Sequence, residues 1–140
     1  MAKKVTLALG VLLLFIGVLG FVPAVTPFGP NGMAYLFSLF LVDPIQNIVH
    51  IAAGVVGLLA SSSHRYSRWF LQVAGIAYAV MAIAGFVQND TVVGLFGVSI
   101  GTNALHALLA AGMLVIGFSP QGTTPEARLS APKPPSKTAM

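Results

Sequence analysis

The 140-residue chain contains no cysteine. This absence excludes disulfides, thiolate-bound metal sites and cysteine nucleophiles. Charge is also scarce, because aspartate, glutamate, lysine and arginine make up 7% of the residues, whereas soluble domains carry about 25%. So few charges cannot cover a surface that faces water, and we therefore expect most of the surface to face a lipid bilayer.

Two further absences narrow the function. The basic residues form no stripe with interleaved aromatic residues, so a nucleic-acid partner is not expected. The sequence also has no Ser-His-Asp set, no paired carboxylates in a site and no phosphate-binding loop. We therefore expect a protein that is not an enzyme.

What the chain has in abundance is apolar residues, 56% of the total, gathered in long runs. Four runs stand out, at residues 5–22, 44–60, 67–87 and 100–118. Each is close to the ~20 residues that cross the hydrocarbon core of a bilayer. Because hydrocarbon offers no hydrogen-bond partner, the backbone of each run must bond to itself as a helix. The prediction is an all-α fold, a four-transmembrane-helix bundle within residues 1–120.

The basic residues predict how the bundle is oriented. They lie before the first run, between the second run and the start of the third, or after the fourth: Lys3, Lys4, Arg65, Arg68, Arg128, Lys133 and Lys137. A path of four helices puts these three places on one side of the membrane, and the positive-inside rule makes that side cytoplasmic. We expect a multi-pass protein of the plasma membrane with both termini in the cytoplasm and the lipid bilayer as its partner.

Three segments need a separate interpretation. Residues 121–140 are rich in Pro, Ser, Thr and Lys, and predict a disordered cytoplasmic tail. Residues 32–42 are apolar but too short to span, so we expect an interfacial helix or a re-entrant element packed on the outer end of the bundle. Residues 1–24 also fit a cleaved signal peptide, with Lys3 and Lys4 before an apolar stretch.

The second half of the chain repeats the first. Gly10 to Val22 matches Gly75 to Val87 at constant spacing, and Leu-Phe-Leu-Val at 39–42 matches Leu-Phe-Gly-Val at 95–98. Both copies enter the membrane in the same direction, which predicts a pseudo-two-fold axis along the membrane normal. The fold class is thus two parallel helix-hairpin repeats, about 5–62 and 67–118. A cleaved first helix would leave the third without a counterpart, which argues against a signal peptide.

Polar residues also recur at matching places. Asp43 and Ser99 stand where an N-cap belongs. Asn47 then corresponds to Asn103 and His50 to His106: Asn47-x-x-His50 and Asn103-x-x-His106. With the repeated Leu-Phe-x-Val element and the helices rich in small residues, this pattern resembles bacterial domain-of-unknown-function family 4383 over about residues 5–118. The resemblance implies a four-helix bacterial membrane protein and no particular activity.

The two Asn-His pairs are the candidate functional residues. Residues three apart share a helix face, and polar groups that face lipid are costly, so Asn47, His50, Asn103 and His106 are expected to form one inner cluster. The favoured interpretation is structural, with neutral histidines hydrogen-bonded across helices and no cofactor. The protein would then act as an accessory or interaction protein, in a homo-oligomer or a larger membrane complex.

Two alternatives remain open at this stage. His50 and His106, on different helices at equal depth, suit bis-histidine ligation of haem b. Parallel repeats with inner polar groups also occur in transporters, which suggests a small-solute transporter or channel subunit. A zinc site is not expected, because two histidines and two asparagines provide no anionic ligand.

Overall fold

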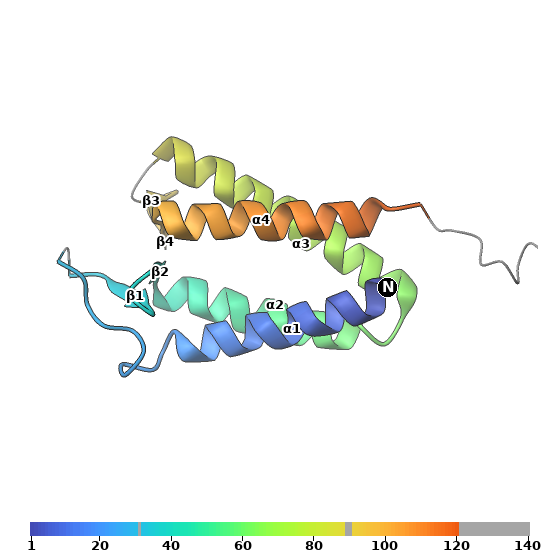
Figure 1. Ribbon diagram of the computed structural model, residues 1–140, viewed down its shortest axis with the longest axis horizontal. Coiled ribbons are helices and arrows are strands. Elements are labelled where there is room, and N and C mark those ends of the chain that lie inside the picture. The colour runs from blue at the N-terminus through green and yellow to red at the C-terminus, as the bar shows by residue number, and fades with distance from the viewer. Residues whose placement is uncertain (31, 89–90, 121–140) are drawn as a thin grey trace, which may run out of the picture.

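The computed structural model describes residues 1–30, 32–88 and 91–120, so the predicted tail at 121–140 lies outside the described residues. The described part contains four helices: α1 (Ala2–Leu19), α2 (Pro44–Ala60), α3 (His64–Gln88) and α4 (Ile100–Phe118). Helix α1 packs antiparallel on α2, and α3 packs antiparallel on α4, so that two helix hairpins lie side by side (Figure 1).

Three of these helices, α1, α3 and α4, are long and apolar enough to cross a membrane, and α2 is apolar but shorter, with 17 residues. Large hydrophobic side chains point outward from each of the four. Examples are Phe15 on α1, Leu59 on α2, Ile83 on α3 and Leu108 on α4, all more than half exposed. Such a surface is unstable in water and suited to hydrocarbon.

The bounds of α2 and α4 agree with the second and fourth apolar runs. Helix α1, however, ends at Leu19, before the predicted Val22. After the cap residue Gly20, the amides of Phe21 and Val22 bond three residues back, to Val18 and Leu19, and Pro23 then ends the turn. Helix α3 is longer than predicted. It begins at His64, directly after a three-residue connection from α2.

The segment 32–42 is not the interfacial helix that the sequence suggested. Strands β1 (Ala34–Leu36) and β2 (Phe40–Val42) form an antiparallel ribbon, and β3 (Thr91–Val92) and β4 (Phe96–Gly97) form a second one. In the first turn Phe37 and Ser38 have φ values of 51° and 61°. Two consecutive left-handed residues make the type of turn that matches the twist of a hairpin.

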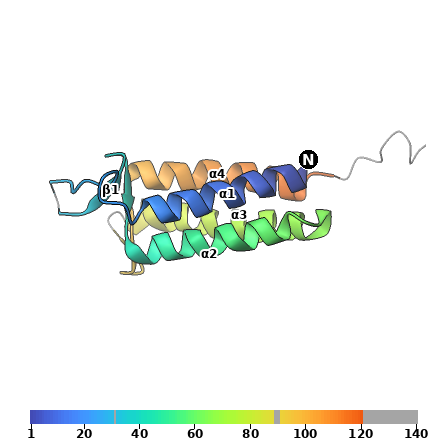
Figure 2. The same ribbon diagram turned by 90° about the horizontal axis from the view of Figure 1, so that it is seen from below.

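Both ribbons cover the same end of the bundle (Figures 1 and 2). The N-terminus, the α2–α3 connection and the end of α4 lie at the opposite end. The first ribbon is packed down on the helices, since Leu36 and Leu41 are buried and the Thr102 hydroxyl donates to the Leu41 carbonyl at 3.3 Å. Below, the two ends are called the ribbon end and the terminal end.

The same helix positions are buried in both hairpins. The buried residues of α1 and their counterparts in α3 are Ala2, Thr6, Gly10, Leu13 and Gly17, and Ser67, Leu71, Gly75, Tyr78 and Ala82. Asp43 caps α2 by accepting from the Gln46 amide, and Ser99 caps α4 by accepting from the Thr102 amide. The sequence similarity of the two halves thus extends to which face of each helix is covered.

Apolar packing fills the terminal half of the bundle. Leu13, Leu71 and Met113 are the largest fully buried apolar side chains, and Phe70 packs beside them. Thr6 on α1 donates to the Ser67 carbonyl on α3 at 3.3 Å, which joins the two hairpins there. The polar residues of interest lie toward the other half, near the ribbons.

Candidate functional site

The two asparagines hold helices together within each hairpin. Asn47 on α2 lies directly against Gly20, and Asn103 on α4 lies directly against Gly85. A Cβ atom at either glycine would overlap the amide group. Both asparagines are 2% exposed, and neither lines the cavity described below. The Asn half of the expected cluster therefore consists of two separate helix–helix contacts.

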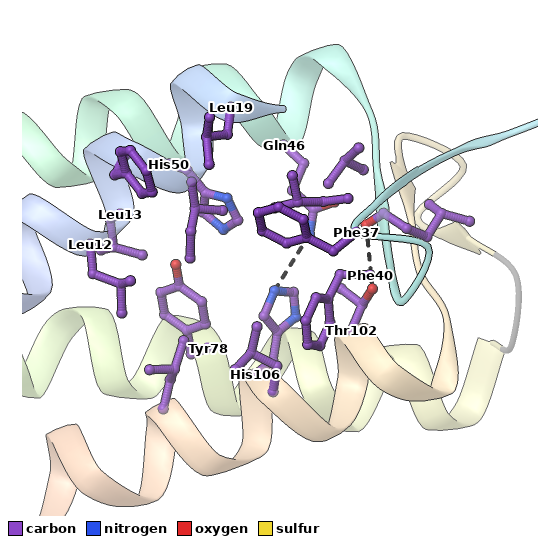
Figure 3. A pocket seen from close by; sticks show the side chains of 17 residues that line it. Leu12, Leu13, Leu19, Phe37, Phe40, Gln46, His50, Tyr78, Thr102 and His106 are labelled. Atoms are coloured by element: carbon purple, nitrogen blue, oxygen red, sulfur yellow. Dashed lines mark hydrogen bonds between the residues drawn. The ribbon is translucent and has the colours of Figure 1, made fainter. Parts of the chain in front are cut away.

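The two histidines lie between the hairpins. Their ring centroids are 6.3 Å apart, with the ring planes nearly perpendicular at 79°. Tyr78 of α3 completes the group, stacked 6.1 Å from His50 and edge-on 5.1 Å from His106. Figure 3 shows the Tyr78 hydroxyl directed toward the helices of the other hairpin. The structure thus brings His50 and His106 together around Tyr78, a residue that the sequence analysis did not single out.

Gln46 is the fourth member of this group, which we call the central polar group (Gln46, His50, Tyr78 and His106). Its side-chain nitrogen lies 3.4 Å from His106 Nε2. Its position is fixed by Asp43, whose Oδ1 accepts from the Gln46 amide at 2.8 Å and whose Oδ2 accepts from the Gly97 amide at 2.9 Å. Asp43 therefore connects the cap of α2 to strand β4 of the other hairpin.

Most polar atoms of the central polar group have no partner among the described residues. They are Gln46 Oε1, His50 Nδ1, Tyr78 Oη and His106 Nδ1. Three of these side chains are more than nine-tenths buried: Gln46 is 4% exposed, Tyr78 9% and His106 3%. An unsatisfied buried polar group costs about 1–3 kcal/mol. Four such groups in contact with one another therefore require an explanation.

Two cavities adjoin the central polar group. The larger, here named the central cavity, measures about 220 Å³ and the second about 160 Å³. Gln46, His50, Tyr78 and His106 line both. The remaining lining is almost wholly apolar, and Phe37 and Phe40 from the β1–β2 ribbon close the central cavity at the ribbon end (Figure 3). None of the described residues that line the two cavities is charged.

The geometry limits what the histidines can ligate. No group of three or more histidine, cysteine or carboxylate ligands occurs within the described ranges. A haem held between His50 and His106 would extend on all sides of the axis that joins them, and the Tyr78 ring lies against both imidazoles on one side. The described arrangement is therefore not shaped for a macrocycle.

The signals that sequence reasoning missed are small ones. Tyr78 places a hydroxyl group in the middle of an apolar run, at the position where α1 has Leu13. Gln46 lies in the first turn of α2, three residues after the cap Asp43, at the position where α4 has Thr102. In both cases the residue differs from its counterpart in the other half, and that difference was the available signal.

Comparison with curated proteins and with solved structures gives no match. The family model described as "Domain of unknown function (DUF4383)" matches residues 3–119, from the second residue of α1 to the residue that follows α4. This range covers both hairpins, both ribbons and the central polar group. The chain therefore belongs to the DUF4383 family, the family that its repeated Asn-x-x-His pattern resembles.

Proposed function

We propose that the chain is an integral protein of the plasma membrane that crosses the bilayer four times with both termini in the cytoplasm. Its two hairpins are copies of one unit, related by a pseudo-two-fold axis along the membrane normal. The outward apolar side chains support this, as does the position of Lys3, Lys4 and Arg65 at the terminal end. Helix α2, about 25 Å long, spans because a bilayer adapts to a short helix at modest cost.

The topology is directly testable because the chain has no cysteine. Ser38, in the β1–β2 turn, and Ser62, in the α2–α3 connection, are both exposed. We expect an impermeant maleimide to label Ser38→Cys on intact cells, and to label Ser62→Cys only after the membrane is opened. Labelling of both, or of Ser62→Cys alone, on intact cells would contradict four spans in this orientation.

Within the membrane, the function that the geometry supports best is the binding of a small lipid-soluble molecule in the central cavity. The observation that carries this proposal is the set of unpartnered, deeply buried polar atoms on the wall of an apolar cavity. A ligand that supplies the missing hydrogen bonds offsets the cost of burying them. As an accessory protein, the chain would hold or present this molecule within the bilayer.

A purely structural role for the histidines has less support. Histidines that lock a bundle bond across it, and the contact between His106 and Gln46 at 3.4 Å is long for a hydrogen bond. The asparagines fit the structural role better, because each fills the space beside a glycine of the neighbouring helix.

A transport pathway also has less support. Between the central cavity and the terminal end lie Leu13, Leu71 and Met113, each at most 1% exposed. A small polar solute would have to displace this packing to reach the cytoplasm. The cavity is therefore better suited to hold a molecule than to conduct one.

Native mass spectrometry of the full chain released from membranes tests the binding function. We expect a bound small molecule at about one equivalent, lost in His106→Leu, because leucine replaces a hydrogen-bonding group by an apolar one. His64→Leu is the matched control, since His64 is exposed at the terminal end. Wild-type protein that stays helical, carries no small molecule and takes up no added lipid-soluble probe would refute the proposal.

A further inference from the structure

The central cavity carries information about the chemistry of its ligand. Building on the proposed function, we propose that it binds a neutral, planar headgroup with carbonyl acceptors on an apolar chain, which is the chemistry of a membrane quinone. The proposal rests on four features of the cavity: the direction of its hydrogen bonds, its lack of charge, its size and its opening.

The unpartnered atoms of the site include two that can donate. The Tyr78 hydroxyl is one of them. His106 Nδ1 is the other, and it donates in one of the two neutral tautomers of the imidazole. The remaining unpartnered atoms of the site are Gln46 Oε1, which only accepts, and His50 Nδ1. The two atoms that can donate favour a ligand that brings acceptors, as carbonyl oxygens do.

The headgroup must also be neutral. The polar side chains that line the central cavity are Gln46, His50, Tyr78, Thr102 and His106, with no lysine or arginine among them. Both oxygens of the nearby Asp43 carboxylate already accept backbone amides. A phosphate or a fatty-acid carboxylate would lie here without a countercharge, which is strongly unfavourable in an apolar site. Phospholipid headgroups and fatty acids are thereby disfavoured.

The size and lining of the central cavity favour a ligand whose headgroup is a single ring. A buried apolar cavity of about 150 Å³ holds benzene, and the central cavity measures about 220 Å³, enough for a ring with substituents. The aromatic rings of Phe37, Phe40, Tyr78 and His106 surround it (Figure 3). Aromatic walls favour a planar ring, because offset stacking and edge contacts both stabilise it.

The cavity has an apolar opening for a chain. Its wall includes Leu12 and Phe15 of α1, which are 41% and 59% exposed, and Leu105 and Leu109 of α4. The cavity therefore reaches the lipid-facing surface between α1 and α4, and an attached apolar chain leaves there. Because Tyr78 on α3 is matched by Leu13 on α1, the hydroxyl lies on one side of the site only, which predicts one molecule per chain in one orientation.

Equilibrium binding to the full chain in detergent tests this chemistry. The probes are a 1,4-benzoquinone with a decyl chain, decylbenzene, which lacks the carbonyls, and dioctanoylglycerol, which has ester carbonyls but no ring. We expect about one equivalent of the quinone to bind, at least tenfold more tightly than the other two, since one good hydrogen bond is worth about a factor of ten.

Two conservative variants locate the donors. Tyr78→Phe removes one hydroxyl and keeps the ring, and we expect it to weaken quinone binding by about tenfold. Tyr66→Phe is the matched control, because Tyr66 is 62% exposed at the terminal end, and it should leave binding unchanged. His106→Leu should weaken binding at least as much as Tyr78→Phe.

The outcomes separate this inference from the function on which it rests. If decylbenzene binds as tightly as the quinone and Tyr78→Phe has no effect, the carbonyl assignment is overturned while binding in the cavity stands. Preference for dioctanoylglycerol overturns the planar ring and keeps the carbonyls. If none of the probes binds to folded protein that also carries no native molecule, the binding function itself is overturned.

Discussion

The two helix hairpins have the same order of elements and bury corresponding helix positions, although their sequences differ at most positions. Residues that are the same in both, such as Asn47 and Asn103, hold two helices of one hairpin together. Residues that differ, such as Tyr78 against Leu13 and Gln46 against Thr102, line the central cavity between the hairpins. His50 and His106 are also the same in both hairpins and line the cavity, so the common residues both build the bundle and supply the two imidazoles, while Tyr78 and Gln46 make the two sides of the cavity chemically different. The predictions below test this comparison, from the largest expected effect to the smallest.

The glycine–asparagine contact should give the largest effect. A Cβ atom at Gly85 overlaps the amide of Asn103, so we expect Gly85→Ala to lower the free energy of unfolding by about 3 kcal/mol. In an Asn103→Ala background the overlap is absent, and the same change should cost less than about 1 kcal/mol. SDS titration followed by circular dichroism measures both. Additive costs in this cycle would show that the asparagine does not occupy the space beside the glycine.

The next largest difference in stability is expected between substitutions at Gly10 and at its counterpart Gly75. A Cβ atom at Gly10 would lie 2.8 Å from the Leu58 backbone nitrogen, whereas at Gly75 it would lie 2.9 Å from carbons of the Leu114 side chain. Backbone cannot move aside as a side chain can, so Gly10→Ala should cost about 2 kcal/mol and Gly75→Ala about half of that. Equal costs in the same titration would mean that both helix pairs adjust equally well.

Removal of the two helix caps should lower the free energy of unfolding by smaller and unequal amounts. Asp43 caps α2 and also accepts from the Gly97 amide of the other hairpin, whereas Ser99 caps α4 and bonds Thr102. We expect Ser99→Ala to cost about 1 kcal/mol and Asp43→Ala about 2 kcal/mol. Asp43→Asn keeps one acceptor and should fall between them. A cost for Ser99→Ala at or above that for Asp43→Ala would argue against the bond across the hairpins.

The smallest change in stability is expected at the central polar group. Tyr78→Phe removes a buried hydroxyl that has no partner among the described residues, so without ligand the free energy of unfolding should change by less than about 0.5 kcal/mol or increase slightly. If the free energy of unfolding of ligand-free protein fell by about 1 kcal/mol or more, the hydroxyl would be bonded within the bundle. That result would support the structural interpretation of the cluster.

Much of the fold was predictable because it depends on local chemistry. The apolar runs and the capping residues Asp43 and Ser99 give the bounds of α2 and α4. The β1–β2 ribbon was missed, since Phe37 and Ser38 are unusual residues for left-handed turn positions and carry no turn signal. The end of α1 was misplaced because Gly20 to Val22 remain apolar after the regular helix has ended.

The candidate site was only partly predictable, for a different reason. Spacing placed each Asn-His pair on one helix face, which is a local property. Which neighbour each side chain meets depends on the packing of whole helices. Asn47 faces its own hairpin partner at Gly20, while His50, one turn later, faces the other hairpin at Tyr78 and His106. No pattern within one helix distinguishes these two directions.

The thermal unfolding midpoint with and without the decyl-benzoquinone tests the account most directly. A ligand that binds only the folded state raises this midpoint. We predict a concentration-dependent rise for the wild-type chain and for His64→Leu, and a much smaller rise for His106→Leu at the same probe concentrations, although all three unfold at similar temperatures without the probe. An equal rise in all three proteins, or no rise in any, would contradict a quinone site between the two hairpins.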